Sequence, residues 1–297
     1  MNGSETHEHD PSKRVAHATV YVVATPIGNL ADISARAVEI LGRVGTIAAE
    51  DTRVTRHLLD HRGISARLIA LHAHNEERAA REVLDILAGG ASVALVSDAG
   101  TPAISDPGAR LVALVREAGY TVCPIPGANA AAAAVSVSGF LSPHFLFYGF
   151  LPARSSARRS ELAALAPVPY SLVFYEAPHR VAECVADLAA VFGAERRLLF
   201  ARELTKLFEE THVCALGEAP AWLAANAHRV KGEYVLVIEG AAAASATESA
   251  DAEKTLAALL EELPLKQAVA LAVKITGGSR NELYQRALAM KNEEVQE

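Results

Sequence analysis

Val96-Ser97-Asp98-Ala99-Gly100-Thr101-Pro102-Ala103-Ile104-Ser105-Asp106-Pro107-Gly108 ends a predicted buried strand, Val93–Ser97, and precedes a helical pattern that begins at Ala109. In open α/β sheets, ligands bind beyond the carboxyl ends of the strands, where glycine lets the backbone come close to a ligand. Two similar loops follow other predicted strands. They are Thr25-Pro26-Ile27-Gly28-Asn29-Leu30 and Pro126-Gly127-Ala128-Asn129. The sequence therefore predicts three loops at one edge of a sheet.

The region around these loops, residues 18–139, reads as an α/β domain. Apolar strands alternate with amphipathic segments, which predicts a mostly parallel sheet covered by helices on both faces. One such helix follows Ser34, with Ile33, Ala37, Ile40 and Leu41 on one face. The predicted strands are Val20–Ala24, Thr46–Ala49, Leu68–Leu71, Val93–Ser97 and Thr121–Ile125.

Residues 140–240 form a second predicted α/β domain. Its last strands have only short connections, so its sheet is expected to be mixed. The predicted strands are Phe145–Tyr148, Ser171–Tyr175, Arg197–Ala201, Thr211–Ala215 and Tyr234–Glu239. Residues 241–252 are small and polar, which indicates a linker. Residues 253–297 carry only helical pattern, broken at Pro264 and at Gly277-Gly278, and predict a small three-helix module.

Composition narrows the functional classes. The chain has 297 residues, of which 51% are hydrophobic and 21% charged, which is typical of a globular protein. Residues 1–17 are polar and predict a disordered tail. No apolar run predicts a membrane span, and three scattered cysteines predict buried free thiols with no metal site. We therefore expect a cytoplasmic protein. The net charge of −7 argues against nucleic-acid binding by the surface as a whole. Local clusters of arginine and lysine are nevertheless compatible with binding of a folded RNA.

The three loops lack the patterns that hold phosphate. None is a GxxxxGK[ST] loop or a GxGxxG fingerprint. They offer carbonyls, small residues and the carboxylate of Asp98 instead, which suits a positively charged sulfonium cofactor without phosphate. Ordinary turn chemistry explains each loop about as well when it is taken singly.

Eight motifs occur in order along the chain. They are TPIGNL (25–30), AEDTR (49–53), HNE (74–76), SDAGTP with ISDPG (97–108), GFLP (149–152), FYEAPHR (174–180), ARELTK (201–206) and KGE (231–233). Together they resemble the ribosomal RNA small subunit methyltransferase I family, the 16S rRNA cytidine 2′-O-methyltransferases of the tetrapyrrole methylase superfamily. The likeness spans roughly residues 19 to 290.

This resemblance implies a two-lobed tetrapyrrole-methylase-like fold, with S-adenosylmethionine in the cleft between the lobes. It further implies a homodimer that methylates a cytidine ribose of the decoding centre in 16S ribosomal RNA, within the small ribosomal subunit. The loop at Pro126–Ala134 departs from the expected turn, which puts contacts by Ala128 and Asn129 in doubt. The implied cofactor contacts are Pro26, Gly28, Asp98, Ala99, Gly100, Thr101, Ile104, Ser105, Phe174, Tyr175, Ala201, Leu204 and Gly232.

Three carboxylates are candidate catalytic bases, because a ribose hydroxyl is a weak nucleophile that must lose its proton. Asp51 is the first candidate, since it follows a strand where the superfamily often has an acidic residue. Glu203 and Glu176 come next, each at a strand end beside a basic residue. Asp51 capping a helix, and Glu176 pairing with Arg180, are open alternatives.

The candidate RNA contacts are Arg53, Arg180, Arg202 and Lys206. The C-terminal module has helix-turn-helix spacing and is either an RNA clamp or a packing or dimer element. Two other functions stay open. One is tetrapyrrole C-methylation, and the other is RNA binding without catalysis by a ribosome-assembly factor.

Overall fold

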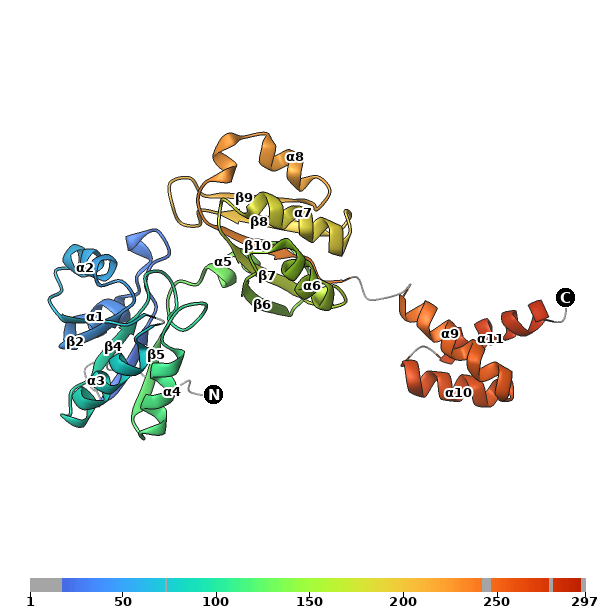
Figure 1. The fold of residues 1–297 in the computed structure, drawn as a ribbon, viewed down its shortest axis with the longest axis horizontal. Helices are drawn as coiled ribbons and strands as arrows, with labels where there is room; N and C mark the ends of the chain where they lie inside the picture. The colour runs from blue at the N-terminus through green and yellow to red at the C-terminus, as the bar shows by residue number, and fades with distance from the viewer. Residues whose placement is uncertain (1–17, 73, 242–246, 278–279, 295–297) are drawn as a thin grey trace, which may run out of the picture.

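A computed structural model describes residues 18–72, 74–241, 247–277 and 280–294. The predicted tail at residues 1–17 and part of the predicted linker, residues 242–246, lie outside these ranges. Figure 1 shows two α/β lobes followed by a group of C-terminal helices. Within the described ranges, no helix combines the length and the apolar composition that crossing a bilayer requires.

The first lobe is built on a five-stranded sheet in the order β3-β2-β4-β1-β5, in which every pair of neighbours is parallel. This confirms the predicted parallel sheet. The strands are β1 (Thr19–Val23), β2 (Thr46–Ala49), β3 (Arg67–Ala70), β4 (Val93–Val96) and β5 (Thr121–Ile125).

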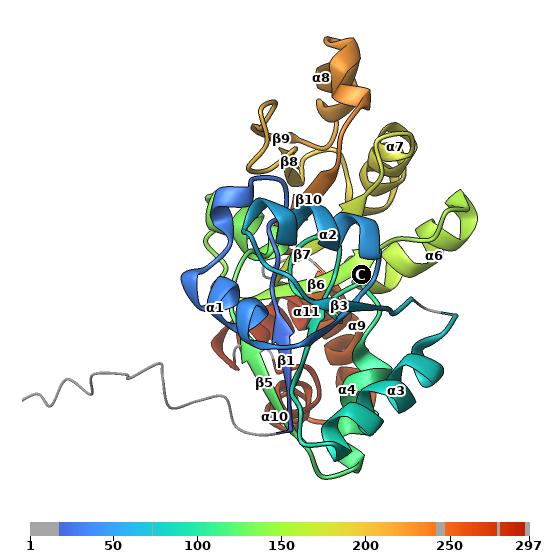
Figure 2. The same cartoon turned by 90° about the vertical axis from the view of Figure 1, so that its left-hand side faces the viewer.

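Helices cover both faces of this sheet, as the alternation of strands and helices predicts (Figure 2). One face packs against α1 (Ala35–Arg43) and α2 (Thr52–His61), and the other packs against α3 (Glu76–Ala88) and α4 (Ala109–Glu117). A short 3₁₀ turn, η2 (Leu30–Asp32), precedes α1. Ser34 caps α1, because its side chain accepts a hydrogen bond from Ala37 N, 3.1 Å away.

The second lobe contains a mixed sheet in the order β6-β7-β10-β8-β9, with β6 and β7 parallel and the other pairs antiparallel. The mixed character is confirmed. The strands are β6 (Phe145–Phe150), β7 (Ser171–Glu176), β8 (Arg197–Arg202), β9 (Glu210–Ala215) and β10 (Tyr234–Ile238). One face packs against α6 (Ser155–Leu165), α7 (Val181–Phe192) and α8 (Ala219–Ala224), and η3 (Ala227–Val230) precedes β10.

The opposite face of the second sheet is covered by α5 (Ala130–Ser136). This helix lies within residues 18–139, which the sequence assigned to the first domain, yet Ala131 and Ala134 pack against Val235 and Val237 of β10. Small alanine side chains allow this close approach of a helix to a sheet. The segment after β5 therefore joins the two lobes by packing as well as by chain connection.

Three helices form the C-terminal module, as predicted: α9 (Thr247–Glu262), α10 (Leu265–Thr276) and α11 (Arg280–Glu294). They share a small core of Leu256, Val269 and Leu283 with neighbouring alanines. The helix α9 begins at Thr247, inside the segment 241–252 that was predicted to be a linker. Alanine and glutamate favour helix, so composition alone could not separate a linker from a first helical turn.

All three cysteines are free thiols. Cys184 is buried, as predicted, whereas Cys123 and Cys214 are only partly buried. These two lie on the outer strands β5 and β9 of their sheets, where one side of the strand has no neighbouring strand to cover it.

Candidate functional site

Backbone and side-chain hydrogen bonds tie the three predicted loops together at the carboxyl edge of the first sheet. Thr25 and Gly100 exchange two backbone hydrogen bonds of 2.8 and 3.1 Å. The hydroxyl of Thr101 donates to the carbonyl of Ala128, 3.3 Å away. The loops after β1, β4 and β5 thus form one surface that faces the second lobe.

A cavity of about 340 Å³ lies between this surface and the second lobe. Residues from the loop after β4 line one side, and residues from the ends of β7, β8 and β10 line the other. Eight of the expected cofactor contacts line it: Ala99, Gly100, Thr101, Ile104, Ser105, Tyr175, Ala201 and Leu204. Asn129, whose contact was in doubt, lines it as well.

A second hollow, of about 260 Å³, adjoins the cavity and contains three more expected contacts, Pro26, Gly28 and Asp98. The two spaces share Ile27, Ala99, Lys206 and Glu233 in their walls.

Two expected cofactor contacts line neither space. The Phe174 side chain is fully buried in the core on the far face of the second sheet, because successive residues of a strand point to opposite faces and Tyr175 takes the near one. Gly232 instead packs against Glu203, whose Cγ would be 2.5 Å from a Cβ added to this glycine. Gly232 therefore helps to shape the position of Glu203.

Backbone strain is concentrated in the two loops that face each other across the cavity. Ala103 and Ser105 in the loop after β4, and Glu203 and Thr205 in the loop after β8, all have positive φ angles of 50–66°. Non-glycine residues adopt this conformation at a cost of roughly 1–2 kcal/mol each. Such strain persists where the surrounding structure imposes it, and it is often found at binding sites.

Two glycines let the lobes interlock next to the cavity. In the first lobe, Gly28 lies so close to Lys206 and Thr205 that a β-carbon would collide with the lysine side chain. In the second lobe, Gly149 has φ of +83°, and a β-carbon there would be 2.7 Å from the hydroxyl oxygen of Ser105. In each lobe, therefore, the absence of a side chain at one glycine makes room for a side chain of the other lobe.

Two partly buried carboxylates lie at these loops: Asp106 lines the cavity, and Glu50 accepts a hydrogen bond from Asp98 N at 3.4 Å. Burial raises the pKa of Asp106 above its usual value, a hydrogen bond with Ser97 opposes that rise, and the charge of Asp98 adds to it. Burial, followed by the charge of Asp106, also raises the pKa of Glu50. A positively charged ligand would relieve this clustering of negative charge. The residues present therefore fit a sulfonium donor.

Asp51 caps α2 and pairs with Arg53. Its Oδ1 accepts a hydrogen bond from Arg53 N at 2.8 Å, and its Oδ2 accepts one from Arg53 Nη2 at 2.6 Å. Hydrogen bonds from the side chain and the backbone of Arg53 lower the pKa of Asp51 to about 2. The capping alternative is the one seen here. A carboxylate engaged in this way is a weak base, and Asp51 does not line the cavity.

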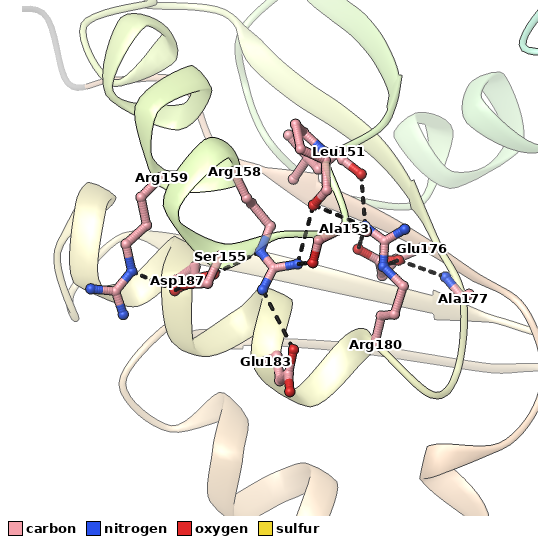
Figure 3. Close-up of polar contacts among 11 residues, drawn as sticks. Leu151, Ala153, Ser155, Arg158, Arg159, Glu176, Ala177, Arg180, Glu183 and Asp187 are labelled. Atoms are coloured by element: carbon pink, nitrogen blue, oxygen red, sulfur yellow. Dashed lines mark hydrogen bonds and ion pairs between the residues drawn. The ribbon is translucent and has the colours of Figure 1, made fainter.

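Glu176 pairs with Arg180, as the structural alternative predicted (Figure 3). Arg180 Nε lies 3.1 Å from Glu176 Oε1, and Arg180 Nη2 donates to the carbonyl of Leu151 at 2.7 Å. The Glu176 side chain has no exposed surface. This pair connects the loop after β7 to the loop after β6, so the guanidinium of Arg180 binds groups of the protein itself.

Arg202 is likewise an internal connector. It is 7% exposed, and its guanidinium donates to the carbonyls of Lys231, Phe208 and His228 at 2.7, 3.2 and 2.9 Å. The expectation that it contacts RNA is therefore not supported by its position. Arg53, in contrast, exposes 89% of its side chain.

Lys206 lines both spaces, and its partner Glu203 lines the cavity. Lys206 Nζ is 2.9 Å from Glu203 Oε1 and 2.7 Å from Glu233 Oε2. Burial alone would raise the pKa of Glu203, but hydrogen bonds from Lys206 and from Glu233 N lower it overall. Lys206 thus lies within the cleft as a fixed positive charge between two carboxylates.

Sequence reasoning missed the role of Glu76, although its motif was recognised. Its carboxylate accepts hydrogen bonds from Gly108 N at 3.3 Å and Arg110 N at 3.2 Å, which caps the start of α4 from a different helix. Gly108 has no side chain to do this. Glu76 therefore anchors the far end of the loop that lines the cavity. Only the spatial proximity of α3 and α4 reveals this, since the two ends are more than thirty residues apart in sequence.

Comparisons with known proteins agree with this architecture. Residues 19–220 match the family model for Tetrapyrrole (Corrin/Porphyrin) Methylases, and residues 246–291 match the model for the RsmI C-terminal HTH domain. Among solved structures, the methyltransferase CobJ has a TM-score of 0.57 at 20% identity, over 75% of this chain and 94% of that one. Uroporphyrin-III C-methyl transferase from Thermus thermophilus, complexed with S-adenyl homocysteine, has a TM-score of 0.54 at 18% identity, over 74% and 97%. These two likenesses concern the fold.

Much closer relatives exist among curated proteins. The Ribosomal RNA small subunit methyltransferase I of Escherichia coli O157:H7 is 51% identical over 91% of this chain and 94% of its own length. The proteins of the same name from Pseudomonas aeruginosa and Neisseria meningitidis are 49% and 45% identical, over 91% and 97% of this chain and 96% and 99% of their own lengths. Because these relatives match nearly the whole chain at 45–51% identity and the two family models match its lobes and its C-terminal module, the chain belongs to the ribosomal RNA small subunit methyltransferase I family of the tetrapyrrole methylases.

Proposed function

We propose that this protein transfers a methyl group from S-adenosylmethionine to the ribose 2′-oxygen of a cytidine in 16S ribosomal RNA, at the decoding centre. The observation that carries the proposal is the interlobe cavity, whose first wall consists of short-side-chain loops and whose surroundings are acidic. A donor with a positive sulfur and no phosphate matches these walls. The curated relatives are named for methylation of ribosomal RNA, and this supports the choice of acceptor.

The proposed donor contacts are the residues of the cavity wall. The loop at Ala99–Thr101 and the pair Ile104-Ser105 contact the donor from the first lobe, while Tyr175, Ala201 and Leu204 contact it from the second. When bound, the donor supplies the electrophilic methyl group. The protein's part is to hold donor and ribose at close range, since positioning provides much of the acceleration in a displacement reaction.

Of the four arginine and lysine residues expected to contact RNA, Arg53 and Lys206 remain in the proposal. Arg53 projects from the start of α2 into solvent and can reach a phosphate. Lys206 lies deeper, at the boundary between the two spaces, and would meet the acceptor nucleotide itself. Replacing Arg53 should weaken RNA binding at all sequences and reduce its salt dependence.

The C-terminal module is proposed as an additional RNA contact. Lys266, Lys274 and Arg280 are exposed on α10 and α11, and the helix-turn-helix match supports a nucleic-acid role. Changing these three residues together to alanine should raise the KM for ribosomal RNA while leaving donor affinity unchanged. A purely packing role would instead show as a lower melting temperature with a normal KM.

The homodimer remains part of the proposal. The edge strand β6 exposes Phe145 and Phe150 to 47% and 54%, and Phe150 also lines the cavity. Light scattering of the purified protein gives the oligomeric state, and a monomeric mass at micromolar concentration would exclude the dimer.

One experiment separates the candidate functions. Purified protein is incubated with tritium-labelled S-adenosylmethionine and with assembled small subunits, free 16S RNA or a tetrapyrrole acceptor. Label in RNA, mapped to a ribose by nuclease digestion and mass spectrometry, supports the proposal. Label only in the tetrapyrrole would indicate the alternative methylase, and RNA binding without transfer would indicate an assembly factor.

A further inference from the structure

The hollow beside the cavity has the position of a second substrate site. It measures about 260 Å³ and lies between the turn after β1, the first turns of α2 and the beginning of the loop after β4. Ile27, Ala99, Lys206 and Glu233 belong to its wall and to the wall of the cavity. A molecule in this hollow would therefore be a direct neighbour of a donor in the cavity.

The walls of this hollow match the two chemical parts of a nucleotide. Pro26, Leu30, Val54 and Leu58 supply apolar surface, on which the face of a base can pack. His57 and Val54 also line an open depression together with the ion pair of Asp51 and Arg53, in which the Arg53 side chain is 89% exposed and can reach a phosphate. The hollow thus combines apolar walls for a base with charged groups, Asp98 and Lys206 in its wall and Arg53 next to it, for the ribose and phosphate of an unstacked nucleotide.

Asp98 gives this hollow a carboxylate oxygen that is open to a ligand. Its Oδ1 accepts a hydrogen bond from Asp51 N at 2.9 Å. Within the described parts of the chain, no group donates a hydrogen bond to its Oδ2. The side chain lines the hollow at the point where the adjacent Ala99 lines both spaces.

The three carboxylates that the sequence favoured are less suited to accept a proton. Arg53 occupies both oxygens of Asp51. Glu176 is enclosed with Arg180. Glu203 Oε1 receives both Lys206 Nζ and Glu233 N at 2.9 Å, and Glu203 lines the cavity but not the hollow, whereas Asp98 lines the hollow. A proton acceptor needs an accessible oxygen within hydrogen-bond reach of the reacting hydroxyl. Asp98 meets this requirement better than these three.

We infer that the hollow between α2 and the Gly28 turn binds the acceptor nucleoside, and that Asp98 accepts the proton of its ribose hydroxyl. The inference rests on the proposed function, which it deepens. The ribose oxygen forms its new bond to the methyl carbon while the carbon–sulfur bond breaks. The electron pair of that bond remains on sulfur, and the hydroxyl proton passes to Asp98 Oδ2 and then to solvent.

Asp98→Asn distinguishes this role from the donor contact that the family resemblance implies for the same residue. Asp85→Asn on the exposed side of α3 is the matched control, since it makes the same change away from both spaces. For Asp98→Asn, calorimetric affinity for S-adenosylhomocysteine should stay within about threefold of wild type, and the single-turnover rate on small subunits should fall about 10²-fold or more.

Either of two results would overturn the role of Asp98. The first is a loss of donor affinity large enough to explain the whole loss of rate, which would make Asp98 a donor contact. The second is a rate equal to that of Asp85→Asn.

The location of the acceptor is tested separately with Val54→Asp and His57→Ala, both at exposed positions of α2 that should tolerate replacement. We expect the KM for small subunits to rise about tenfold, with donor affinity and melting temperature unchanged. An unchanged KM in both variants, with normal methylation by the wild type, would refute the hollow as the acceptor site and leave the proposed function standing. A wild type that transfers no methyl group to RNA would instead refute the proposed function.

Discussion

Removal of the Glu76 carboxylate tests whether this side chain fixes the loop after β4, which lines the proposed donor cavity. Glu76, the first residue of α3, accepts hydrogen bonds from Gly108 N and Arg110 N at the start of α4. The loop that ends at Gly108 contains the strained residues Ala103 and Ser105. Without the carboxylate, the first turn of α4 loses its cap, and the strained loop gains freedom to relax away from the cavity.

The size of the effect follows from the geometry. Loss of an N-terminal cap costs about 1 kcal/mol. The two distances, 3.3 and 3.2 Å, are at the long end for hydrogen bonds, so a value near the middle of the range for caps is appropriate. If donor binding must supply this 1 kcal/mol to order the loop, Glu76→Ala weakens donor affinity about fivefold.

Isothermal titration with S-adenosylhomocysteine measures this directly. Glu77→Ala is the matched control, because Glu77 is also an acidic residue in the first turn of α3 but makes only a 3.9 Å contact with Arg110. Glu76→Gln keeps one acceptor oxygen and should fall between wild type and Glu76→Ala. Equal affinities for Glu76→Ala and Glu77→Ala would refute the proposed link between this cap and the cavity.

Three further predictions concern stability and the fit of the lobes. Arg158→Leu should lower the free energy of unfolding by about 1–3 kcal/mol, because the buried Asp187 loses its 2.7 Å partner but keeps Arg159 and Ser155. In urea denaturation, the double change with Asp187→Leu should cost less than the sum of the single changes. Gly149→Ala should weaken donor binding about tenfold more than Gly139→Ala. Both glycines have positive φ, but only Gly149 lies against Ser105, and overpacking costs about 1–3 kcal/mol. Equal effects would show that the close packing of Gly149 against Ser105 does not shape the cavity. Asp106→Asn should raise the melting temperature at neutral pH and weaken donor binding. Folding raises the pKa of Asp106, so its ionisation lowers the free energy of unfolding as pH rises from about 4 through the folded pKa, and this decrease should be smaller in the variant.

Most of the fold follows from local pattern. Apolar runs bounded by turn residues locate every strand of both sheets to within one or two residues, and the expected parallel and mixed arrangements are both present. The assignment of α5 could not be predicted in this way. Its sequence of alanines has no strong amphipathic pattern, so the sheet against which it packs is decided by the second lobe, far along the chain.

The sequence predicted the parts of the candidate site that are formed by backbone loops. It missed the parts that depend on side chains from distant segments. Loops after β1, β4 and β5 must share an edge once the strands are parallel, so their motifs suffice to locate the cavity. Charged residues next to these motifs were harder to assign. Arg180 and Arg202 are directed at main-chain carbonyls of other segments, which no sequence spacing indicates. A residue's place in a motif therefore did not show whether its side chain contacts a ligand or binds other segments of the protein.

The two strained loops are each fixed at one end by a carboxylate, and this indicates how the cleft keeps its shape. Glu76 holds the start of α4 after Ala103 and Ser105, while Glu203 itself receives Lys206 and the backbone of Glu233. Because unfavourable backbone conformations relax unless the structure imposes them, these anchors must outweigh the strain before any ligand arrives. Weakening an anchor should then reduce affinity without removing a donor contact. Donor binding in this family would accordingly depend on residues that never touch the donor.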